Sequence, residues 1–449
     1  MNDVSVITLS ESAAKALDLL EAVGFESWCV GGCVRDALLG RAVNDYDIAT
    51  AASWEQAERV LADGGFAVHR TGVKHGTITA VLDGEALEVT TYRADGAYVD
   101  GRHPDGVTFV KSIEEDLARR DFTMNALAYH PDRGLLDCWG GLDDVRAGLI
   151  RAVGDPARRF AEDGLRVLRG CRFASQLGFS IEPQTLQAMR ANKKMLACVS
   201  AERVTHELDG MLLGGHVGDA LIECVDVLVA VLPEVAACRG FDQRTPYHIY
   251  DVWEHTARVV QCAPLTLRAR WAALFHDIGK PAACFSEGDR MHFYGHPEIS
   301  ARLAEGAMRR LLMAPRFIAG VLKLVRMHDR QIAASPRSVR RALAGFDGDI
   351  ELFRELIGLK RADAMAQSEL SRPRLDLADD LERILGDLLA ADAVFTVKQL
   401  AIDGNDVMAL GVPAGPSVGD ALDAALEAVM DERVDNDRGQ LLAFVESRL

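Results

Sequence analysis

The order of secondary-structure patterns along this 449-residue sequence limits its fold more than any other feature. Strand patterns occur at 27–30, 44–49, 77–82, 86–91 and 107–110, and helical patterns at 11–23, at 34–39 and from about 113. Asp83-Gly84 predicts a two-residue hairpin turn. After Gly154-Asp155-Pro156 the strand patterns end, and 157–345 holds helical stretches broken by Gly and Pro. We therefore expect an α+β protein: a mixed sheet with helices, then an all-α remainder.

Charge and composition exclude several classes of protein. The sequence has 50 basic against 67 acidic residues, a net charge of −17, whereas a general nucleic-acid-binding field requires the opposite sign. Residues 151–204 depart from this balance, with ten bases against five acids, which fits either phosphate binding or solvated helix faces. No apolar run predicts a membrane span or a signal peptide, so we expect a cytoplasmic protein without a membrane partner. Nine scattered cysteines without a CxxC pair disfavour zinc fingers and disulfide scaffolds.

Two aspartates spaced two residues apart form the first candidate site. On a strand over 44–49, Asp45 and Asp47 would point to the same face. Paired carboxylates are suited to Mg²⁺, with substrate phosphates completing its coordination shell. Two such ions can activate an attacking oxygen and stabilise the leaving one. Glu88, on a neighbouring predicted strand, is the candidate third carboxylate; an exposed strand residue is the alternative.

A glycine turn precedes these aspartates. Gly31 and Gly32 follow the apolar run 27–30 and come before a predicted helix. Glycines in such a turn let backbone N–H groups approach a phosphate, and a helix N-terminus adds positive potential. Arg35 lies one turn inside that helix and could reach a phosphate oxygen. Strand, glycine turn, helix and aspartate pair in this order indicate a nucleoside triphosphate site.

Residues 119–127 form a second candidate element. Arg120 would contact phosphate and sugar, with Asp121 and Asn125 organising the site. The alternative is a helix end with surface charges.

Residues 162–173 contain a carboxylate and a guanidinium that together could recognise a base. Asp163 and Arg166 would be neighbours on one helix face, as a simple ion pair or as base-recognising groups. A carboxylate accepts and a guanidinium donates, which matches the pairing edges of adenine and cytosine and leaves guanine and uracil unpaired. Arg169 and Arg172 turn away from that face, so we expect phosphate or backbone contacts from them.

Together these motifs resemble the class II tRNA nucleotidyltransferases (CCA-adding enzymes) and the related bacterial poly(A) polymerases. The family patterns GGxVRDxLLGR with DxD, RRDFTxNA, a Gly-rich element, EDxLRxLRxxRF, ExR and a Gly-rich tail stretch stand at 31–47, 119–126, 140–143, 162–173, 201–204 and 403–419. The resemblance implies template-independent addition of CCA to the 3′ end of tRNA from CTP and ATP. It assigns Mg²⁺ to Asp45 and Asp47, the triphosphate and sugar to Gly32, Arg35 and Arg120, and the nucleotide pocket to Asp163, Arg166, Arg169 and Arg172.

A histidine-rich segment forms the third candidate site. Its potential metal ligands are His255, His276, Asp277, His296, His328 and Asp363. The series resembles the HD phosphohydrolase superfamily, which implies phosphoester hydrolysis by metal-activated water. Histidine and carboxylate ligands suit Mn, Fe, Ni, Co or Zn without choosing among them. Similar modules in nucleotidyltransferases are associated with 2′,3′-cyclic phosphodiesterase, 2′-nucleotidase or phosphatase activity, and a vestigial site that keeps the ligands is the alternative.

These resemblances imply four parts. They are a polymerase-β-type nucleotidyltransferase head at 1–150, a neck of nucleotide-recognition and RNA-binding helices at 151–245, an HD domain at 246–370 and a helical tail at 371–449. The motifs leave A-adding, CC-adding and poly(A)-adding enzymes open. A protein that is mainly an HD phosphohydrolase with a nucleotide- or RNA-binding head is the further alternative.

Overall fold

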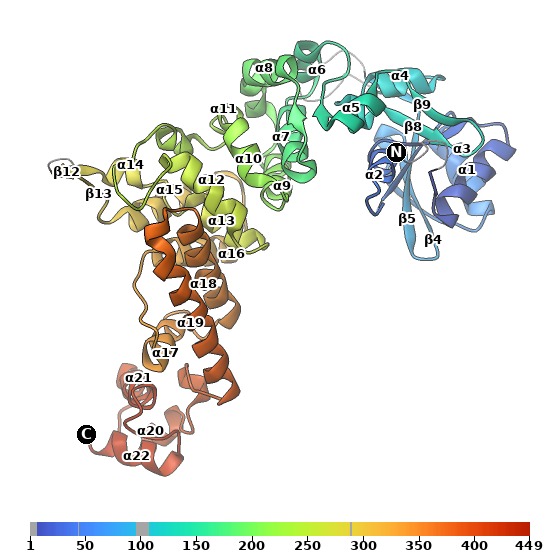
Figure 1. The fold of residues 1–449 in the computed structure, drawn as a ribbon. Helices are drawn as coiled ribbons and strands as arrows, with labels where there is room; N and C mark the ends of the chain where they lie inside the picture. The colour runs from blue at the N-terminus through green and yellow to red at the C-terminus, as the bar shows by residue number, and fades with distance from the viewer. Residues whose placement is uncertain (1–6, 44, 96–106, 288–289) are drawn as a thin grey trace. The chain divides into compact units, whose positions relative to one another are not determined.

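The computed structural model describes residues 7–43, 45–95, 107–287 and 290–449. The chain divides into two compact units, Met1–Pro233 and Glu234–Leu449, which are described separately (Figure 1). No helix among the described residues is both long and apolar enough to cross a membrane.

A seven-stranded mixed sheet forms the core of the head. Its strand order is β3-β4-β5-β2-β1-β8-β9. The strands are β1 (Ser27–Val30), β2 (Tyr46–Thr50), β3 (Ala67–Gly72), β4 (Thr77–Leu82), β5 (Glu85–Thr91), β8 (Leu127–His130) and β9 (Gly134–Asp137). Only β2 and β5 pair in parallel; the other neighbours are antiparallel. Asp83 and Gly84 both have positive φ angles, 50° and 84°, which confirms the two-residue hairpin turn between β4 and β5.

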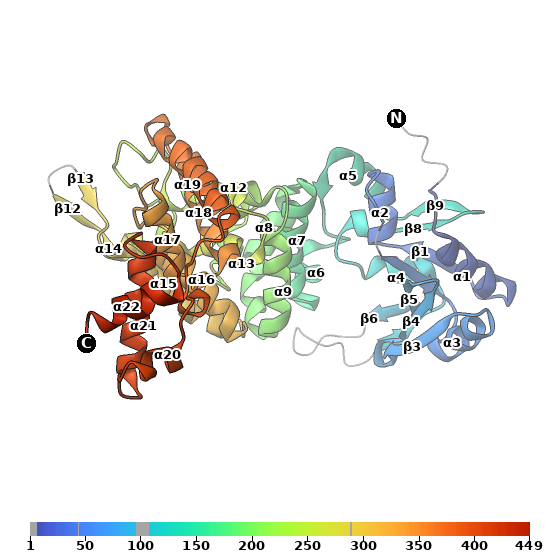
Figure 2. The same ribbon diagram turned by 90° about the horizontal axis from the view of Figure 1, so that it is seen from below.

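Helices α1 (Glu11–Ala22), α2 (Gly32–Leu38) and α3 (Trp54–Asp63) pack against the sheet, as Figure 2 shows for the head. Helix α4 (Ile113–Ala118) contacts β6 (Arg93–Asp95), which pairs with β7 (Val107–Phe109), and α5 (Gly141–Ala147) contacts the short strand that follows it. Ser53 caps α3 through a reciprocal capping box with Gln56. A buried apolar cluster that includes Trp28, Tyr92 and Leu117 joins β1 to α4. This packing fixes the strand ends that carry the candidate residues.

A helical segment completes the first unit. Its helices are α6 (Pro156–Glu162), α7 (Leu165–Leu177), α8 (Pro183–Asn192), α9 (Ala201–Leu212), α10 (Val217–Glu223) and α11 (Val225–Leu228). Helix α7 packs on α9 and α10, while α6 packs on α8. The central position of α7 follows from its many buried side chains.

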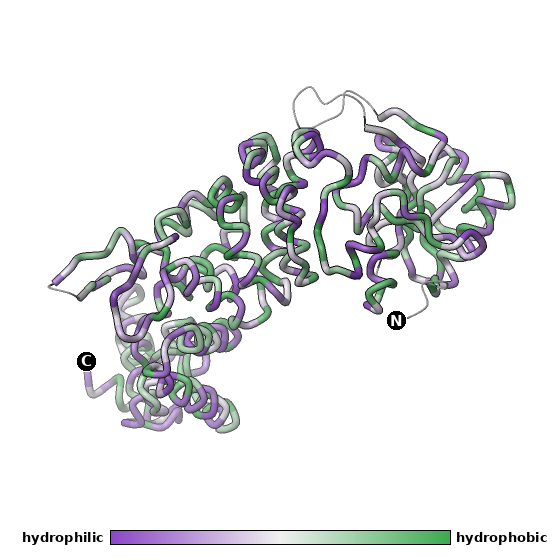
Figure 3. Tube along the Cα trace, turned by 45° about the horizontal axis from the view of Figure 1, so that its top comes forward, coloured by the Kyte–Doolittle hydropathy of each residue, from purple (hydrophilic) through white to green (hydrophobic). Residues whose placement is uncertain are grey.

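The second unit is helical apart from one hairpin. Its helices are α12 (Val252–Cys262), α13 (Leu267–Phe275), α14 (Lys280–Ala283), α15 (His296–Arg310), α16 (Pro315–Met327), α17 (Pro336–Ala344), α18 (Ile350–Met365), α19 (Arg372–Ala390), α20 (Gly404–Ala409), α21 (Pro416–Met430) and α22 (Arg438–Glu446). Hydrophobic and hydrophilic residues alternate along them in Figure 3, as in amphipathic helices around a core. The hairpin pairs β12 (Phe285–Glu287) with β13 (Arg290–His292).

The α+β fold, a mixed sheet with helices followed by a helical remainder, is confirmed, and three details differ. The remainder is not entirely helical, because β10 (Leu149–Ile150) pairs with β11 (Ser180–Ile181), and β12 pairs with β13. Strands of two or three residues are too short to carry a period-two pattern. The strand expected at 44–49 begins at Tyr46, and Asn44 lies outside the described residues. Helix α2 begins at Gly32, two residues before the predicted start.

Candidate active site in the head and candidate metal centre in the helical unit

Three carboxylates lie along the parallel pair of strands in the head. Asp47 on β2 is in register with Glu88 on β5, the neighbouring strand expected for a third carboxylate, and Asp45 directly precedes β2. Burial raises the pKa of Asp47 to about 6; Arg120 acts against this rise, whereas the negative charges of Glu88 and Asp45 add to it. A bound cation would relieve this repulsion, so the carboxylates fit a divalent ion. The three do not converge tightly, because none belongs to a three-ligand group with all donor atoms within 4.8 Å.

The turn needs glycine at position 31, because the side chain of Arg120 lies too close for a Cβ atom there. The φ angle of Gly31 is 79°, and a Cβ atom at this position would lie 2.6 Å from Nη1 of Arg120. The N–H of Gly31 donates to the carbonyl of Leu127, which ties the turn to β8. Any side chain at Gly31 would therefore strain the backbone and displace an arginine of the site. Gly32 follows as the first residue of α2.

Arg35 and Arg169 are linked through a buried polar network. Nη1 of Arg35 donates to Oδ1 of Asn125 at 2.6 Å, and Nδ2 of Asn125 donates to Oδ1 of Asp121 at 3.2 Å. Nε of Arg169 donates to Oδ2 of Asp121 at 2.6 Å. Although burial alone would raise it, the charge and hydrogen bond of Arg169 lower the pKa of Asp121 to about 2. Asp121 and Asn125 thus hold two arginines in fixed positions.

Arg120 is positioned by a residue that the sequence reasoning missed. Asp116 on α4 is buried, and its Oδ2 lies 3.2 Å from Nη2 of Arg120. Asp116 also pairs with Arg119, at 2.9 Å. The spacings of three and four residues on a helix were visible in the sequence and could have revealed this acid.

Asp163 and Arg166 do not share a helix, so the expected helical pair is wrong. Helix α6 ends at Glu162, and Asp163 is extended, with φ −140° and ψ 110°. Helix α7 begins at Leu165 after Gly164, where a Cβ atom would lie 2.7 Å from the carbonyl oxygen of Met195. The close approach of that backbone explains why glycine occupies the break.

Each of the two residues has a different partner instead. Nη1 of Arg166 donates to Oε2 of Glu162 at 2.7 Å, and its Nη2 donates to the carbonyl of Arg119 at 3.0 Å. Oδ2 of Asp163 accepts from Nη2 of Arg203 on α9 at 3.1 Å. Glu162 and Arg203 therefore orient the candidate base-recognising groups, and the sequence reasoning did not identify these pairings.

The other arginines of α7 also form ion pairs. Nε of Arg172 donates to Oε2 of Glu207 on α9 at 2.6 Å. The guanidinium carbons of Arg172, Arg169 and Arg35 lie 4.4, 5.3 and 5.3 Å from the ring centre of Phe173, a cation–π arrangement. Eight of the ten basic residues in 151–204 form ion pairs with acids, so most of the local positive charge is compensated.

One cavity of about 700 Å³ brings all the candidate head residues together. Its lining includes Gly31, Gly32, Arg35, Asp45, Asp47, Glu88, Arg120, Asp121, Asn125, Asp163, Arg166, Arg169 and Arg172. Carboxylates from β2 and β5 and arginines from α2 and α7 therefore face the same space. This arrangement can hold a cation, a polyphosphate and a base at once.

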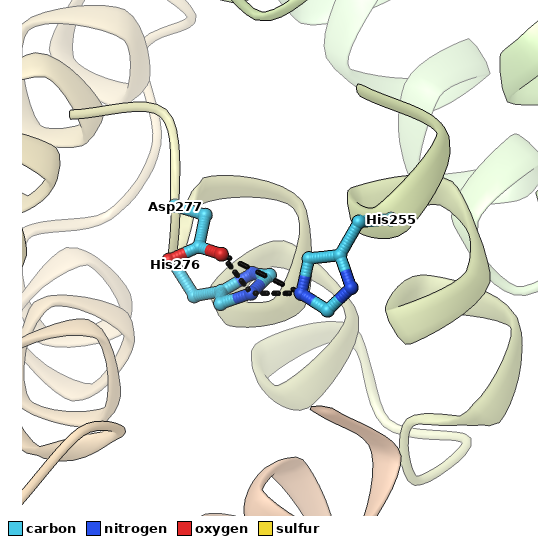
Figure 4. Close-up of side chains that lie close together, drawn as sticks. All are labelled: His255, His276 and Asp277. Atoms are coloured by element: carbon cyan, nitrogen blue, oxygen red, sulfur yellow. Dashed lines mark hydrogen bonds and ion pairs between the residues drawn. The ribbon is translucent and has the colours of Figure 1, made fainter. Parts of the chain in front are cut away.

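The second unit brings six candidate metal ligands into one buried centre. His255 lies on α12, His276 and Asp277 directly follow α13, His296 begins α15, His328 follows α16 and Asp363 lies on α18. We call these six residues the HD centre. Figure 4 shows His255, His276 and Asp277 turned toward one another. The four histidines are at most 7% exposed, as required of ligands to an enclosed cation.

Backbone carbonyls fix the orientation of all four histidine rings. The Nδ1 atoms of His255, His276, His296 and His328 lie 3.2, 2.7, 2.9 and 2.7 Å from the carbonyl oxygens of Ala366, Ala273, Phe293 and Val325. A carbonyl only accepts, so each Nδ1 carries a proton and each Nε2 is the ring atom that is left for a metal ion. This is the tautomer that metal-ligating histidines adopt, and it is held by the same kind of contact.

Asp277 lies between two groups of ligands. Its Oδ2 is 3.1 Å from Nε2 of His276 and 3.5 Å from Nε2 of His255. Its Oδ1 is 3.2 Å from Nε2 of His296, yet this buried atom has no hydrogen-bond partner in the described part of the chain. Nε2 of His328 lies 3.2 Å from Nε2 of His296. The donor atoms therefore form two candidate metal-binding groups that share Asp277.

Charged neighbours surround the HD centre. Nζ of Lys280 is 2.6 Å from Oδ2 of Asp277 and donates to Oε1 of Gln243 at 2.8 Å. Burial alone would lower it, but hydrogen bonds to Asp277 and Asp363 raise the pKa of His255 to about 9. Lys280 was missed by the sequence reasoning, although its position three residues after Asp277 was visible.

Four family models match the chain. The Poly A polymerase head domain matches residues 27–151, and the probable RNA- and SrmB-binding site of polymerase A matches 178–238. The HD domain matches 247–384, and the tRNA nucleotidyltransferase domain 2 matches 359–445. Nucleotidyltransferase and HD domains generally use divalent metals.

Individual relatives extend the likeness over nearly the whole chain. The CCA-adding enzyme of Geobacillus thermodenitrificans is 35% identical over 432 residues, covering 95% of this chain and 94% of the relative. That of Geobacillus stearothermophilus is 33% identical over 441 residues, covering 98% and 97%. The crystal structure of the Bacillus stearothermophilus CCA-adding enzyme in complex with CTP has a TM-score of 0.75 and 30% identity, covering 98% of each chain. This chain belongs to the CCA-adding enzyme family of tRNA nucleotidyltransferases.

Proposed function

We propose that this chain adds CCA to the 3′ end of tRNA without a template, using CTP and ATP. The observation that carries the proposal is the cavity in which the carboxylates of β2 and β5 face the arginines and Asp163. Family membership supports the same activity. A tRNA substrate is consistent with a cytoplasmic protein.

We propose that Asp45 and Asp47 hold Mg²⁺ in the head. The ion, when bound, stabilises charge on the α-phosphate and on the leaving pyrophosphate. Arg120, held by Asp116, and Arg35, held by Asn125, bind the triphosphate and sugar at the glycine turn. The 3′-hydroxyl of the RNA attacks the α-phosphate in line, so catalysis is positioning and charge stabilisation. Glu88, in register with Asp47, keeps the carboxylate cluster negative.

Base selection falls to Asp163 and Arg166 in this proposal. Asp163 accepts from the amino group that both cytosine and adenine carry, and Arg166 donates to the neighbouring ring nitrogen. Arg203 and Glu162 keep the two side chains in place, at 3.1 and 2.7 Å. Guanine and uracil would leave these groups unpaired in the cavity, which rejects them. Arg169 and Arg172 complete the nucleotide pocket, one beside Asp121 and the other beside Glu207.

A nucleotide ladder tests the addition reaction. Transfer RNA lacking its last three nucleotides is incubated with CTP, with ATP or with both, and products are resolved by length. We expect two additions with CTP alone and three with both nucleotides. Addition of A alone, of two C residues only, or of a long A tail would replace the proposal with an A-adding, CC-adding or poly(A) enzyme.

We also propose a second, metal-dependent phosphohydrolase activity at the HD centre. The supporting observation is that all four histidine Nε2 atoms and both oxygens of Asp277 face one another. Mn, Fe, Co, Ni or Zn suits these ligands, and the bound ion would activate water. Metal analysis and hydrolysis assays with His276→Ala test this. The alternative, a protein that is mainly a hydrolase with a nucleotide- or RNA-binding head, predicts that His276→Ala abolishes its principal activity.

We propose the four-part division of the chain into 1–150, 151–245, 246–370 and 371–449. The family matches at 27–151, 178–238, 247–384 and 359–445 support this order of parts. Limited proteolysis followed by mass spectrometry would test the boundaries.

A further inference from the structure

Three aromatic rings lie against one another at the β12–β13 hairpin, and we call them the aromatic stack because two of the three pairs are nearly parallel. Phe285 on β12 is the register partner of His292 on β13, and Tyr294 lies two residues beyond. The ring centres of Phe285 and His292 are 5.3 Å apart at 26°, and those of His292 and Tyr294 are 5.4 Å apart at 18°. Phe285 also lies 5.7 Å from Tyr294. The rings of His292 and Tyr294 are therefore nearly parallel, whereas Phe285 is tilted by 42° against Tyr294.

Solvent reaches this stack although its rings are apolar. The exposed fractions are 47% for Phe285 and 75% for Tyr294, and no other large hydrophobic side chain among the described residues is as exposed as Tyr294. Both rings are outside the core, so folding alone does not explain a stacked aromatic group in water. Exposed aromatic faces are the surfaces on which nucleobases stack.

Two rings of the stack, those of His292 and Tyr294, line the same cavity as residues of the HD centre. A cavity of about 290 Å³ is lined by His292 and Tyr294 and also by Asp277, His296, His328 and Asp363. Lys280 and Arg374 line it as well, and they lie 2.6 and 3.5 Å from oxygens of Asp277 and Asp363. The cavity is thus lined by basic side chains, by candidate metal ligands and by aromatic rings.

We propose that His292 and Tyr294, against which Phe285 packs, bind the nucleobase of a nucleoside phosphate whose phosphate lies at the HD centre. The proposal rests on the hydrolase function proposed above and adds its substrate selectivity. Lys280 and Arg374 complement the phosphate, while the stack gives base contacts that tolerate any base, because every base has a π face. The ligand is a free nucleotide or the terminal nucleotide of an RNA.

The reaction at the phosphate needs only water. A water oxygen forms a new bond to phosphorus, the bond from phosphorus to a ribose oxygen breaks, and that oxygen takes up a proton. The stack takes no part in this step, so its residues are positioning residues. Their loss should raise KM for nucleoside substrates and leave kcat nearly unchanged.

Substrates with and without a base test the proposal. Metal-loaded full-length protein is assayed on adenosine 2′,3′-cyclic phosphate and on glycerol 1,2-cyclic phosphate, which keeps the cyclic phosphodiester and lacks a base. Tyr294→Leu removes a ring, and Tyr294→Phe is the matched control that keeps it. We expect Tyr294→Leu to raise KM for the nucleoside substrate roughly 5- to 100-fold, the range of one base–aromatic stack, with no change for the glycerol substrate and none in Tyr294→Phe.

A binding measurement without metal gives an independent readout. Quenching of a 2-aminopurine nucleoside 2′-phosphate is compared between wild type and Tyr294→Leu, and we expect weaker quenching in the variant. Thermal melting and metal content verify that the variant is folded and loaded. A lower KM for a short RNA ending in the cyclic phosphate would identify RNA as the ligand, and an equal KM would identify the free nucleotide.

Different results would refute the hydrolase function and the base-stacking proposal. If wild-type protein hydrolyses neither cyclic phosphate with any of the five metals, the hydrolase function is wrong. If it hydrolyses both and Tyr294→Leu changes neither KM nor quenching, the base-stacking proposal is wrong while the hydrolase function stands.

Discussion

The two candidate sites of this chain hold their carboxylates in opposite ways. At the HD centre, Asp277 is surrounded by histidines whose rings are each fixed by a backbone carbonyl, and Lys280 lies 2.6 Å away. In the head, Asp47 faces Glu88 and Asp45, which repel it, and burial raises its pKa to about 6. The HD centre is therefore organised before its cation binds, whereas the head site is completed by cation and substrate together.

The largest expected effect comes from removing a carboxylate of the head. Asp45→Ala should reduce nucleotide addition by roughly 1000-fold or more, because charge on the α-phosphate and pyrophosphate would lose its counter-charge. Single-turnover extension of tRNA measures this, and Glu85→Ala on the same sheet, outside the cavity, is the control. Near-normal turnover in Asp45→Ala would refute the assignment of Mg²⁺ to this residue. The contrast between a head site completed by a cation and the HD centre would then be unsupported.

Removal of the shared ligand is the corresponding test at the HD centre. Asp277→Asn should abolish metal binding at the HD centre and lower hydrolysis by at least about 100-fold, because one carboxylate faces both ligand groups. Metal content by mass spectrometry and hydrolysis of a cyclic phosphate measure the effect. Asp242→Asn, an exposed acid of the same unit, is the control. Retention of one equivalent of metal would show that the two groups bind independently.

Short, ordered motifs predicted which residues lie together. The glycine turn, Asp45 and Asp47, the RRD element and the six HD residues could be named from the sequence, because each motif needs particular residue types at fixed spacing. All thirteen head residues line one cavity, and the HD residues converge as the pattern predicts.

Partners distant in sequence could not be predicted in the same way. Asp163 was paired with Arg166 by helical spacing, but the helix breaks at Gly164 because the Met195 backbone packs there. Arg203 and Glu207 come from α9, so only the packing of α7 on α9 brings them to the site. The aromatic stack lies at a hairpin whose two strands, β12 and β13, have three residues each. Strands this short carry no periodic pattern, so neither the strands nor the stack could be predicted.

An intermediate effect is expected on base selection. Asp163→Ala should lower the preference for CTP and ATP over UTP and GTP by roughly 10- to 100-fold, because one acceptor for the amino group is lost. Competition between nucleotides in single-addition assays measures the ratio. Arg203→Ala should have a smaller effect in the same direction, since Arg203 only holds Asp163. Unchanged selection in both variants would show that Asp163 does not recognise the base.

Asp121 gives the head a carboxylate held by cations, as Asp277 is in the HD centre. Its folded pKa of about 2 lies below the ordinary value, so it contributes stability above pH 4 that is lost as the pH falls toward 2. Asp121→Asn should cost about 2 kcal/mol at pH 7 and about half of that at pH 3. Urea unfolding at the two pH values measures the difference. An equal cost at both pH values would mean that Arg169 does not hold the carboxylate.

The smallest effect has the opposite sign and concerns Asp47. Its folded pKa of about 6 lies above the ordinary value of about 3.9, so the folded state binds more protons and loses stability as the pH rises from about 4 to 6. Above that range an ionised Asp47 destabilises the metal-free head. Asp47→Asn should then stabilise it by about 1–2 kcal/mol at pH 7, reduced from the full shift because the carboxylate is partly exposed to solvent.

This gain should vanish at pH 4 and shrink when Mg²⁺ and a nucleotide are present, because the cation relieves the repulsion in the wild type. Urea unfolding in chelator, with and without the ligands, measures it. If Asp47→Asn destabilised the metal-free head at pH 7, the carboxylate would already be held by its neighbours as Asp277 is. The head site would then be organised in advance like the HD centre, and the contrast between the two would disappear.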